Sequence, residues 1–538
     1  MLGNAMQKAE YVTSDPPVQS AATGQSNAEE RQYPDKLDAA LFRVAAVCGM
    51  ATIMALLDTT VVSVAQRTFA AQFGSTLAVV SWTMAGYMLA LATVIPVTGW
   101  AVDRFGTKRL FMGAVFVFTL GSLLCALAPN ILALIIFRVI QGLGGGMLMP
   151  LSSMILTREA GPQRLGRLIA IGGIPLILAP IGAPILGGWV IDTYGWEWIF
   201  LINLPIGITT IGLAAILFPR DRPEPSEALD FTGALLLSPG VAIFLCGVSS
   251  IPGRHTVADR YVLIPVIIGL VLITAFVWHA WYRTDHPLID LRLLKNRVVT
   301  QANLTLLVFT VGYVGAGLTL PSYFQLVMNE TPMQSAMRLV PQALGAALTM
   351  PLAGMYADKR GPGKVVLIGL PLIAGGLAVF AFGVARHADY LPTLLVGLAI
   401  MGLGIGCTTA PLGAAVVQAL SPQQIARGTT LVSVNLEVSS SIGAALMAVI
   451  VTTQINRNDI IAGKAASAAS NVAGHGPAAN ASGGAARQAL PPDVASALLN
   501  NLSHAYTTVF VLAVALVAFT IIPAAFLPKK APVRPTDD

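Results

Sequence analysis

The feature that most constrains this chain is a series of long apolar runs separated by short polar or Pro/Gly-rich breaks. A helix needs about 20 predominantly apolar residues to cross the hydrocarbon core of a bilayer. Only helices and closed barrels satisfy their backbone groups there. We therefore expect an all-α, polytopic membrane protein with fourteen spans, at 41–65, 79–101, 110–128, 131–156, 168–191, 198–218, 230–249, 261–281, 298–326, 335–356, 365–385, 391–419, 429–453 and 505–527.

Composition excludes the other classes. Only 11% of the 538 residues are charged, against roughly 25% in soluble domains, and the mean hydropathy is +0.73. A single soluble globule would need far more charge on its surface, and a disordered chain would need lower hydrophobicity. The 4 cysteines lie inside apolar runs without CxxC spacing, and the 6 histidines show no HExxH pattern. We expect no metal, no disulfide and no cofactor.

The distribution of basic residues predicts the topology. With the N-terminus inside, the cytoplasmic segments carry most of the 32 Lys and Arg residues, as the positive-inside rule requires. Both termini are then cytoplasmic, with a disordered tail at 1–40 and a cytoplasmic tail at 528–538. The Ala-, Gly-, Ser- and Asn-rich segment 454–504 becomes a long extracytoplasmic loop. It is either a flexible connection or a docking element for a periplasmic adaptor protein.

Two loops share a pattern. Gly99–Arg109 and Gly354–Lys364 each place an Asp four residues after the first Gly, followed by basic residues and another Gly. This repetition predicts a six-helix bundle at 41–218 and another at 298–527, with two helices inserted between them at 219–297. Two such repeats enclose a central cavity near the middle of the membrane, which is typical of transporters.

Two carboxylates and one arginine lie well inside predicted spans. A carboxylate at the centre of a span costs about 2.5–3.5 kcal/mol, so Asp58 and Glu437 should face the bundle interior or a water-filled cavity. Each is either a polar packing contact or a group that binds protons or cations. Arg138 is permanently charged and needs a carboxylate, carbonyl or water as its partner. It either ties neighbouring helices together or tunes the acidic groups.

Several segments together resemble the major facilitator superfamily, and within it the fourteen-helix drug:proton antiporters of the multidrug efflux type. The signature loop of the superfamily is similar to the Gly99–Arg109 loop. The motifs of the first, fourth, fifth and sixth helices are similar to Leu57–Val61, Arg138–Gly144, Ala179–Gly188 and Trp196–Gly207. The likeness extends from about residue 41 to 527.

The resemblance implies roles for particular residues. It connects Arg138 with proton coupling. A conformational gate is expected in the signature loop, where glycines allow close approach and charges can latch helices, at Gly99, Asp103, Arg104, Gly106, Lys108 and Arg109. The fifth helix implies export, through the bendable sequence of Pro180, Gly182, Pro184, Gly187 and Gly188.

Four aromatic and amide side chains are candidates for the substrate cavity: Tyr87, Gln141, Tyr313 and Gln325. Ordinary packing and the aromatic belts of membrane proteins explain such residues equally well. They therefore remain candidates for a cavity wall and do not identify the cargo.

The sequence thus predicts a proton-coupled exporter of amphipathic or cationic small molecules, such as drugs, in the cell (inner) membrane. A dedicated exporter of one metabolite, lipid or siderophore is the alternative on the same fold. A membrane-embedded enzyme or receptor is the alternative of another class, but the chain has no GxxxxGK[ST] or GxSxG sequence. The expected partners are small molecules, protons and the lipid bilayer, with no nucleic acid.

Overall fold

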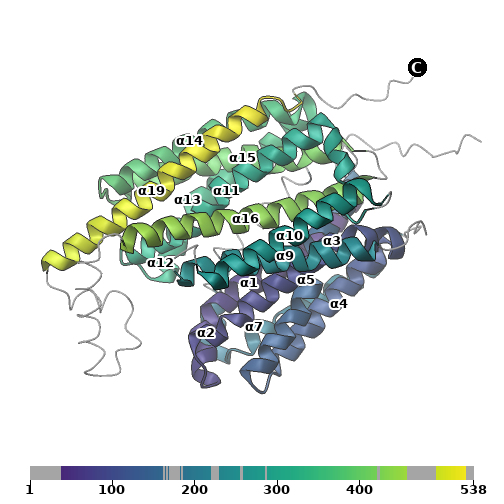
Figure 1. Ribbon diagram of the computed structural model, residues 1–538, viewed down its shortest axis with the longest axis horizontal. Helices are drawn as coiled ribbons and strands as arrows, with labels where there is room; N and C mark the ends of the chain where they lie inside the picture. Colours follow the sequence, from purple (N-terminus) through teal and green to yellow (C-terminus); the bar gives the residue numbers. More distant parts are fainter. Residues whose placement is uncertain are drawn as a thin grey trace, which may run out of the picture. The chain divides into compact units, whose positions relative to one another are not determined.

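The computed structural model describes residues 38–160, 164, 168, 182, 186–219, 230–254, 259–284, 287–420, 424–456 and 492–528. The regular structure of these residues is entirely helical (Figure 1). The elements are α1 (Ala39–Gln72), α2 (Leu77–Val80), α3 (Trp82–Phe105), α4 (Thr107–Ala126), α5 (Ile131–Ala160), α7 (Trp198–Leu201), α8 (Asn203–Leu217), α9 (Phe231–Arg254), α10 (Arg260–Tyr282), η1 (Leu291–Lys295), α11 (Arg297–Leu326), α12 (Pro332–Arg338), α13 (Val340–Arg360), α14 (Pro362–Ala385), η2 (Tyr390–Leu394), α15 (Leu395–Gln418), α16 (Ile425–Asn456) and α19 (Pro492–Ala524).

The described part of the chain contains twelve helices that are long and apolar enough to cross a membrane. The all-α membrane fold predicted from the sequence is therefore confirmed. The predicted span at 335–356 corresponds to α12 and α13; α13 is not among the twelve, and its sequence carries Gln342 and ends in Asp358, Lys359 and Arg360. The predicted span at 168–191 lies mostly outside the described residues, although 186–194 is helical.

Polar residues in the breaks between apolar runs determine where several helices begin. The side chains of Asp38, Asp259 and Asn296 accept hydrogen bonds from the first backbone N–H groups of α1, α10 and α11. Thr331 and Gln334 form a reciprocal capping box at α12. The first N–H groups of a helix have no partner within the helix. These capping side chains accept their hydrogen bonds in place of water.

The described helices pack in two groups that follow the order of the sequence. In the first group α5 packs on α1, α3 and α4, while α8 packs on α1 and α4 (Figure 1). In the second group α11 packs on α16 and α19, and α15 packs on α13 and α14. Contacts between α16 and both α3 and α5 join the two groups.

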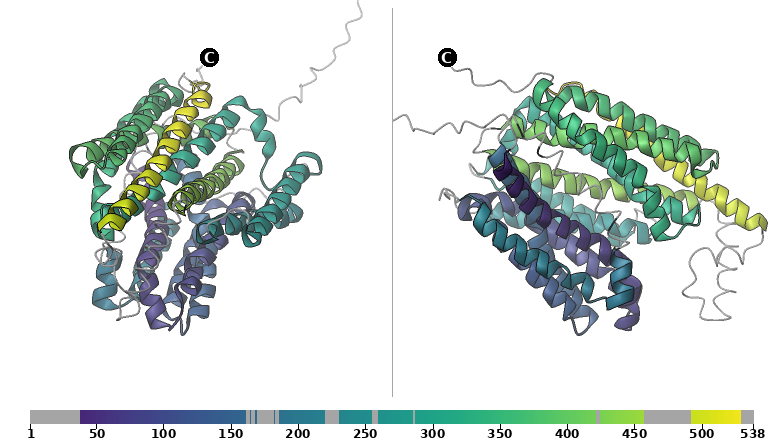
Figure 2. Two further views of the ribbon diagram at one scale, coloured as in Figure 1. Left: turned by 60° about the vertical axis from the view of Figure 1, so that its left-hand side comes forward. Right: turned by 180° about the vertical axis from the view of Figure 1, so that it is seen from behind.

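The inserted helices α9 and α10 pack on each other, and α9 also contacts α3 and α16 (Figure 2). The hairpin therefore lies against one helix of each group. At its base, Asp230 Oδ1 is 2.9 Å from His279 Nε2 and accepts a hydrogen bond from the Gly233 N–H at 2.8 Å. The Asp230 carboxylate thus fixes the end of α10 to the beginning of α9.

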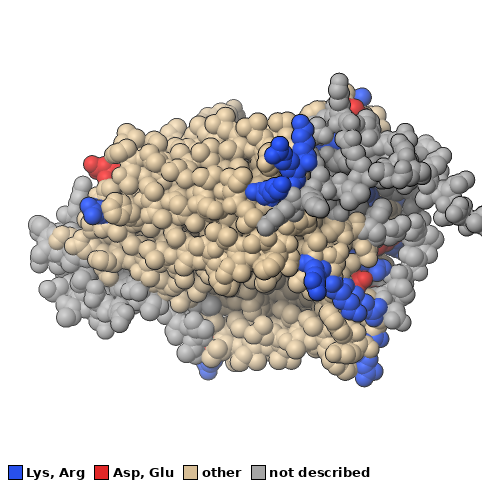
Figure 3. Space-filling view, turned by 90° about the horizontal axis from the view of Figure 1, so that it is seen from above, with Lys and Arg blue, Asp and Glu red and all other residues tan. Residues whose placement is uncertain are grey.

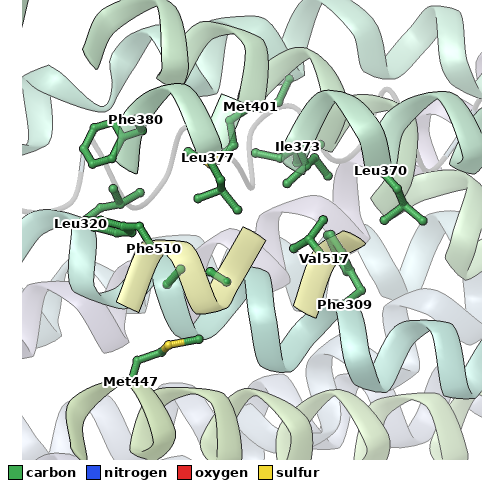
Figure 4. Close-up of a cluster of buried hydrophobic side chains, with 14 of the residues drawn as sticks. Phe309, Leu320, Leu370, Ile373, Leu377, Phe380, Met401, Met447, Phe510 and Val517 are labelled. Atoms are coloured by element: carbon green, nitrogen blue, oxygen red, sulfur yellow. The ribbon is translucent and has the colours of Figure 1, made fainter. Parts of the chain in front are cut away.

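Apolar side chains from five helices form the core of the second group (Figure 4). Phe309 comes from α11, Phe380 from α14, Met401 from α15, Met447 from α16 and Phe510 from α19. Because lipid tails are as apolar as these side chains, close van der Waals packing rather than the hydrophobic effect holds such helices together.

The outer surface suits a bilayer. One face shows a broad area without Lys, Arg, Asp or Glu, and the charged side chains gather toward its edges (Figure 3). Large apolar side chains are widely exposed, including Ile216 at 80% and Leu348 at 70%. Exposure on this scale would cause aggregation in water, whereas lipid accommodates it.

The two repeated loops have the same backbone geometry. Gly106 joins α3 to α4 with φ 84° and ψ 155°, and Gly361 joins α13 to α14 with φ 89° and ψ 143°. Residues other than glycine rarely adopt this positive φ. The internal repeat in the sequence is therefore also a repeat in the structure, with a glycine at the same turn.

The last helix is longer than the apolar run that predicts it. α19 begins at Pro492, inside the segment 454–504 that the sequence assigns to a loop. Proline is well tolerated in the first turn of a helix, and the following residues, such as Ala495 and Leu498, favour helix. An apolar run measures only the part of a helix that contacts lipid. The rest of that segment, 457–491, lies outside the described residues.

Candidate functional site

Asp58 lies on α1 with only 2% of its surface exposed. Both of its carboxylate oxygens contact donors from other helices. Arg138 Nη1 on α5 lies 2.5 Å from Asp58 Oδ2, and both side chains are fully buried. Gln141 Nε2, one turn further along α5, donates to Asp58 Oδ1 at 2.8 Å. The carboxylate that the sequence places in an apolar span is thus paired with the arginine that the sequence also singles out.

Two further polar residues complete this network. Asn203 Nδ2, at the first position of α8, donates to Asp58 Oδ1 at 3.2 Å. Asn203 and Gln141 also donate to the hydroxyl oxygen of Ser122 on α4, at 2.9 and 2.7 Å. Residues of α1, α5 and α8 therefore meet at one carboxylate, α4 joins them through Ser122, and every described contact to the carboxylate oxygens comes from a donor. This arrangement stabilises the negative charge of Asp58.

Arg138 is held by more than its ion pair. Its Nε donates to the Thr83 carbonyl oxygen at 3.1 Å, and its guanidinium carbon lies 4.2 Å from the centre of the Tyr87 ring. The Phe200 ring is 5.8 Å away. Nη2 is buried without a hydrogen-bond partner in the described part of the chain. Ring faces attract cations, so the two aromatic residues offset part of the cost of burying this charge.

The glycines of α5 make this geometry possible. A Cβ atom on Gly142 would lie 2.5 Å from the Tyr87 carbonyl oxygen on α3, and one on Gly144 would lie 2.5 Å from the Phe118 nitrogen on α4. Small residues let helix backbones approach closely in membranes. The backbone of α5 therefore lies against the backbones of α3 and α4 just beyond Arg138 and Gln141.

Glu437 is in a different environment. It lies half-buried on α16, the helix that contacts α3 and α5. In the described part of the chain no Lys, Arg or His forms an ion pair with it. Its electrostatic influence nevertheless reaches the neutral phenol of Tyr87 on α3. Among the described residues, the carboxylate of Asp58 thus has a counter-ion, whereas that of Glu437 has none.

The four residues that the sequence assigns to a substrate cavity divide into two pairs. Tyr87 and Gln141 are 1% and 0% exposed and belong to the Asp58 network. Tyr313 and Gln325 lie half-buried on α11. The Tyr313 ring stacks on Phe309 with the centroids 5.2 Å apart. In this conformation the Gln141 amide holds the Asp58 carboxylate.

In the predicted gate, Gly99 and Gly106 are buried, Arg104 and Arg109 are exposed, and Asp103 is half-buried. Lys108 has a defined role at the beginning of α4. Its Nζ donates to the carbonyl oxygens of Ala215 and Phe218 at 2.6 and 2.8 Å. These carbonyls end α8, where the helix dipole favours a cation.

The Lys108 contacts give a first prediction. Replacing Lys108 with methionine removes the cation from the end of α8, and we expect a loss of about 1 kcal/mol of stability. A thermal unfolding curve in detergent measures this as a lower midpoint. Arg109→Met, which removes an exposed cation from the next position, is the matched control. Equal midpoints for the two variants would exclude a structural role for Lys108.

The predicted antiporter helix is described only in part. Pro180 and Pro184 lie outside the described residues. Gly187 lies against α1, because a Cβ atom on it would be 2.8 Å from Val61 Cγ1. Gly182 and Gly188 have no atom within 4 Å of the corresponding position. Gly187 is thus where this helix approaches α1, close in sequence to Asp58.

Sequence reasoning missed Asn203 and Ser122 as site residues. Asn203 lies within the sixth-helix motif Trp196–Gly207, and an amide inside an apolar run is itself a signal of a polar partner. Ser122 has no comparable signal, since serine packs at many helix contacts. Only the tertiary structure places its hydroxyl between two amides.

Apolar membrane-crossing helices in two groups, with a charged network buried among them, define a membrane transport protein. Residues 48–444 match the profile of the Major Facilitator Superfamily. The chain belongs to this family.

Several relatives are similar over most of their length. The chain is 61% identical over 534 residues to the Multidrug resistance protein B homolog of Mycobacterium tuberculosis (strain ATCC 25618 / H37Rv), covering 98% of both chains. It is 29% identical to the Multidrug export protein EmrB of Escherichia coli (strain K12), covering 74% of this chain and 78% of that one. Among solved structures, the human organic anion transporter MFSD10 has a TM-score of 0.55 at 15% identity, covering 89% of this chain and 99% of that one. That likeness shows the fold alone.

Proposed function

We propose that this protein is a proton-coupled exporter of amphipathic or cationic small molecules, drugs among them, in the cell (inner) membrane with both termini in the cytoplasm. Its similarity to relatives named for multidrug resistance and multidrug export supports the substrate class. The two six-helix halves would alternate between openings to either side of the membrane, with the signature loop as the gate.

One observation carries the proposal: a buried carboxylate that has a counter-ion, and a second carboxylate on another membrane-spanning helix that has no cationic partner in the described residues. Asp58 has Arg138 as its counter-ion, whereas Glu437 has no cationic partner in the described residues. We assign the proton to Asp58 and the cationic group of the cargo to Glu437. Both are inside the membrane, where a charge must have a use that offsets its cost.

The arrangement provides a reason for exchange. A proton on Asp58 cancels the negative charge and leaves Arg138 as a buried, unbalanced cation. Arg138 lies against the Tyr87 ring, and Tyr87 interacts electrostatically with Glu437. Protonation therefore makes the surroundings of Glu437 more positive and disfavours a bound cation. Binding of a proton and binding of a cationic cargo oppose each other, as antiport requires.

The driving force is sufficient. One proton entering the cell releases about 2.3 kcal/mol per 100 mV of membrane potential and about 1.36 kcal/mol per pH unit. A tenfold gradient of a neutral compound costs about 1.4 kcal/mol. A single proton thus supports a gradient of a few hundredfold.

The test is transport in proteoliposomes containing the purified full chain. The lumen of the vesicles is made acidic, and transport is measured for the molecules whose cytoplasmic face is in the external medium. These molecules should take up a fluorescent lipophilic cation into the lumen as protons leave it. We expect Asp58→Asn protein that elutes as a folded, monodisperse species to show no proton-driven uptake, because the side chain no longer carries a proton. Glu437→Gln should reduce uptake of cationic compounds at least tenfold and spare neutral ones.

The outcomes separate the two assignments. Proton-driven uptake that survives in Asp58→Asn would refute the proton role of this residue. Equal losses of cationic and neutral cargo in Glu437→Gln would refute its role in recognising charge. A competition panel in the unmodified protein measures breadth, and a single accepted compound would contradict a multidrug exporter.

A further inference from the structure

Among the donors to Asp58, Asn203 is the one free to change its role. Arg138 carries only N–H groups and cannot accept a hydrogen bond. The Gln141 side-chain oxygen accepts from Arg138 Nη1 at 2.6 Å and from the Cys125 thiol at 3.6 Å, so this amide is fixed in one orientation. In the described part of the chain no donor contacts the Asn203 side-chain oxygen.

This difference matters once Asp58 is protonated. A proton on either oxygen of the carboxylate meets N–H groups that point at it, because all the present contacts come from donors. One partner must then offer an acceptor. Turning Gln141 would aim its NH₂ group at Arg138 and bring two donors together. Turning Asn203 presents its oxygen to Asp58 Oδ1 and breaks no other hydrogen bond to that oxygen.

Ser122 can follow the turn. Its hydroxyl oxygen accepts from both amides in the present arrangement. A hydroxyl is also a donor and rotates to suit its partners. When Asn203 turns, the Ser122 hydroxyl can donate to the same amide oxygen and continue to accept from Gln141. The pair Asn203 and Ser122 therefore satisfies both protonation states of the carboxylate.

We propose that Asn203 is a positioning residue of the proton site, whose side-chain amide donates to ionised Asp58 and turns to accept from protonated Asp58. Asn203 is at the first position of α8. Rotation of its side-chain amide therefore changes the contact between α8 and Asp58 on α1 each time Asp58 takes up a proton from solvent. The inference rests on the proposed function of Asp58 and adds a residue that responds to the proton.

The pH dependence of transport tests this role. The titratable and charged groups that interact with Asp58 are Arg138, Tyr87 and Cys125, and Glu437 lies within electrostatic range of Tyr87. All of them stay in place when Asn203 is replaced by leucine, which has a similar volume and no polar atoms. A hydrogen bond to a charged carboxylate is roughly twice as strong as a neutral one, so the loss penalises the ionised form more. We expect the midpoint of the pH profile of uptake to move upward by about one pH unit.

A matched control exists on the same helix. Thr210 is fully buried on α8, and its hydroxyl donates only to the Ile206 carbonyl oxygen of that helix at 2.7 Å. Thr210→Val removes a buried polar atom from α8 without touching Asp58, and its pH midpoint should equal that of the unmodified protein. If Asn203→Leu does not fold, Ser122→Ala takes its place, with a smaller shift in the same direction.

Infrared difference spectra between acid and neutral pH give a direct readout. The carboxylic acid C=O band that disappears in Asp58→Asn belongs to Asp58, and it should shift in Asn203→Leu because the amide no longer accepts from the acid. An unshifted band together with an unshifted pH midpoint would overturn the role of Asn203. That result, with Asp58→Asn still inactive, would leave the proposed function intact.

Discussion

Replacing Arg138 with methionine is expected to leave most of the protein unfolded or aggregated after extraction in detergent. Methionine fills a similar volume, but Asp58 loses its counter-ion in a site where it is 2% exposed. Removing one partner of a buried ion pair costs about 3–5 kcal/mol, because the remaining charge has no compensation. A protein of marginal stability does not tolerate a loss of that size.

The double variant Asp58→Asn/Arg138→Met separates charge balance from packing. It removes both charges and should recover most of the monodisperse fraction in size-exclusion chromatography and most of the thermal midpoint, while proton-driven transport remains absent. Arg104→Met removes an exposed arginine on α3 and serves as the control. If the double variant is no more stable than Arg138→Met, the uncompensated charge is not the cause of the loss.

Adding one methyl group at Gly121 should have a comparably large effect. A Cβ atom there would lie 2.7 Å from the Cα and Cβ atoms of Gln141 and 2.8 Å from its backbone nitrogen. Backbone cannot move aside as a flexible side chain can, so α4 and α5 must separate. Overpacking of this kind costs about 1–3 kcal/mol, and it also displaces an amide that holds Asp58.

Gly113 provides the control on the same helix. No atom lies within 4 Å of the position that its Cβ would occupy. Gly113→Ala should be neutral or slightly stabilising, because alanine favours helix by up to about 1 kcal/mol over glycine. We expect Gly121→Ala to lose transport and to unfold at a lower temperature. Equal behaviour of the two variants would show that α4 and α5 are not in the close contact described here.

The internal repeat illustrates what a sequence pattern can and cannot give. The Gly and Asp spacing predicts matching turns, and Gly106 and Gly361 do adopt matching conformations. The contacts of the two turns differ in kind. Lys108 reaches the end of α8 with its side chain, whereas Gly363 donates its backbone N–H to the Pro528 carbonyl oxygen at 3.0 Å. A pattern of residue types constrains the local backbone, while its partners depend on the helix that arrives there.

The sequence by itself determined the membrane-spanning helices, because lipid acts on each run of about 20 residues separately and makes every unpaired backbone group costly. It also required partners for Asp58 and Arg138, since an isolated charge is unstable there. Which partners they have was decided only by the tertiary structure. Asp58 is separated from Arg138, Gln141 and Asn203 by 80, 83 and 145 positions, and helix packing alone brings them within hydrogen-bond distance.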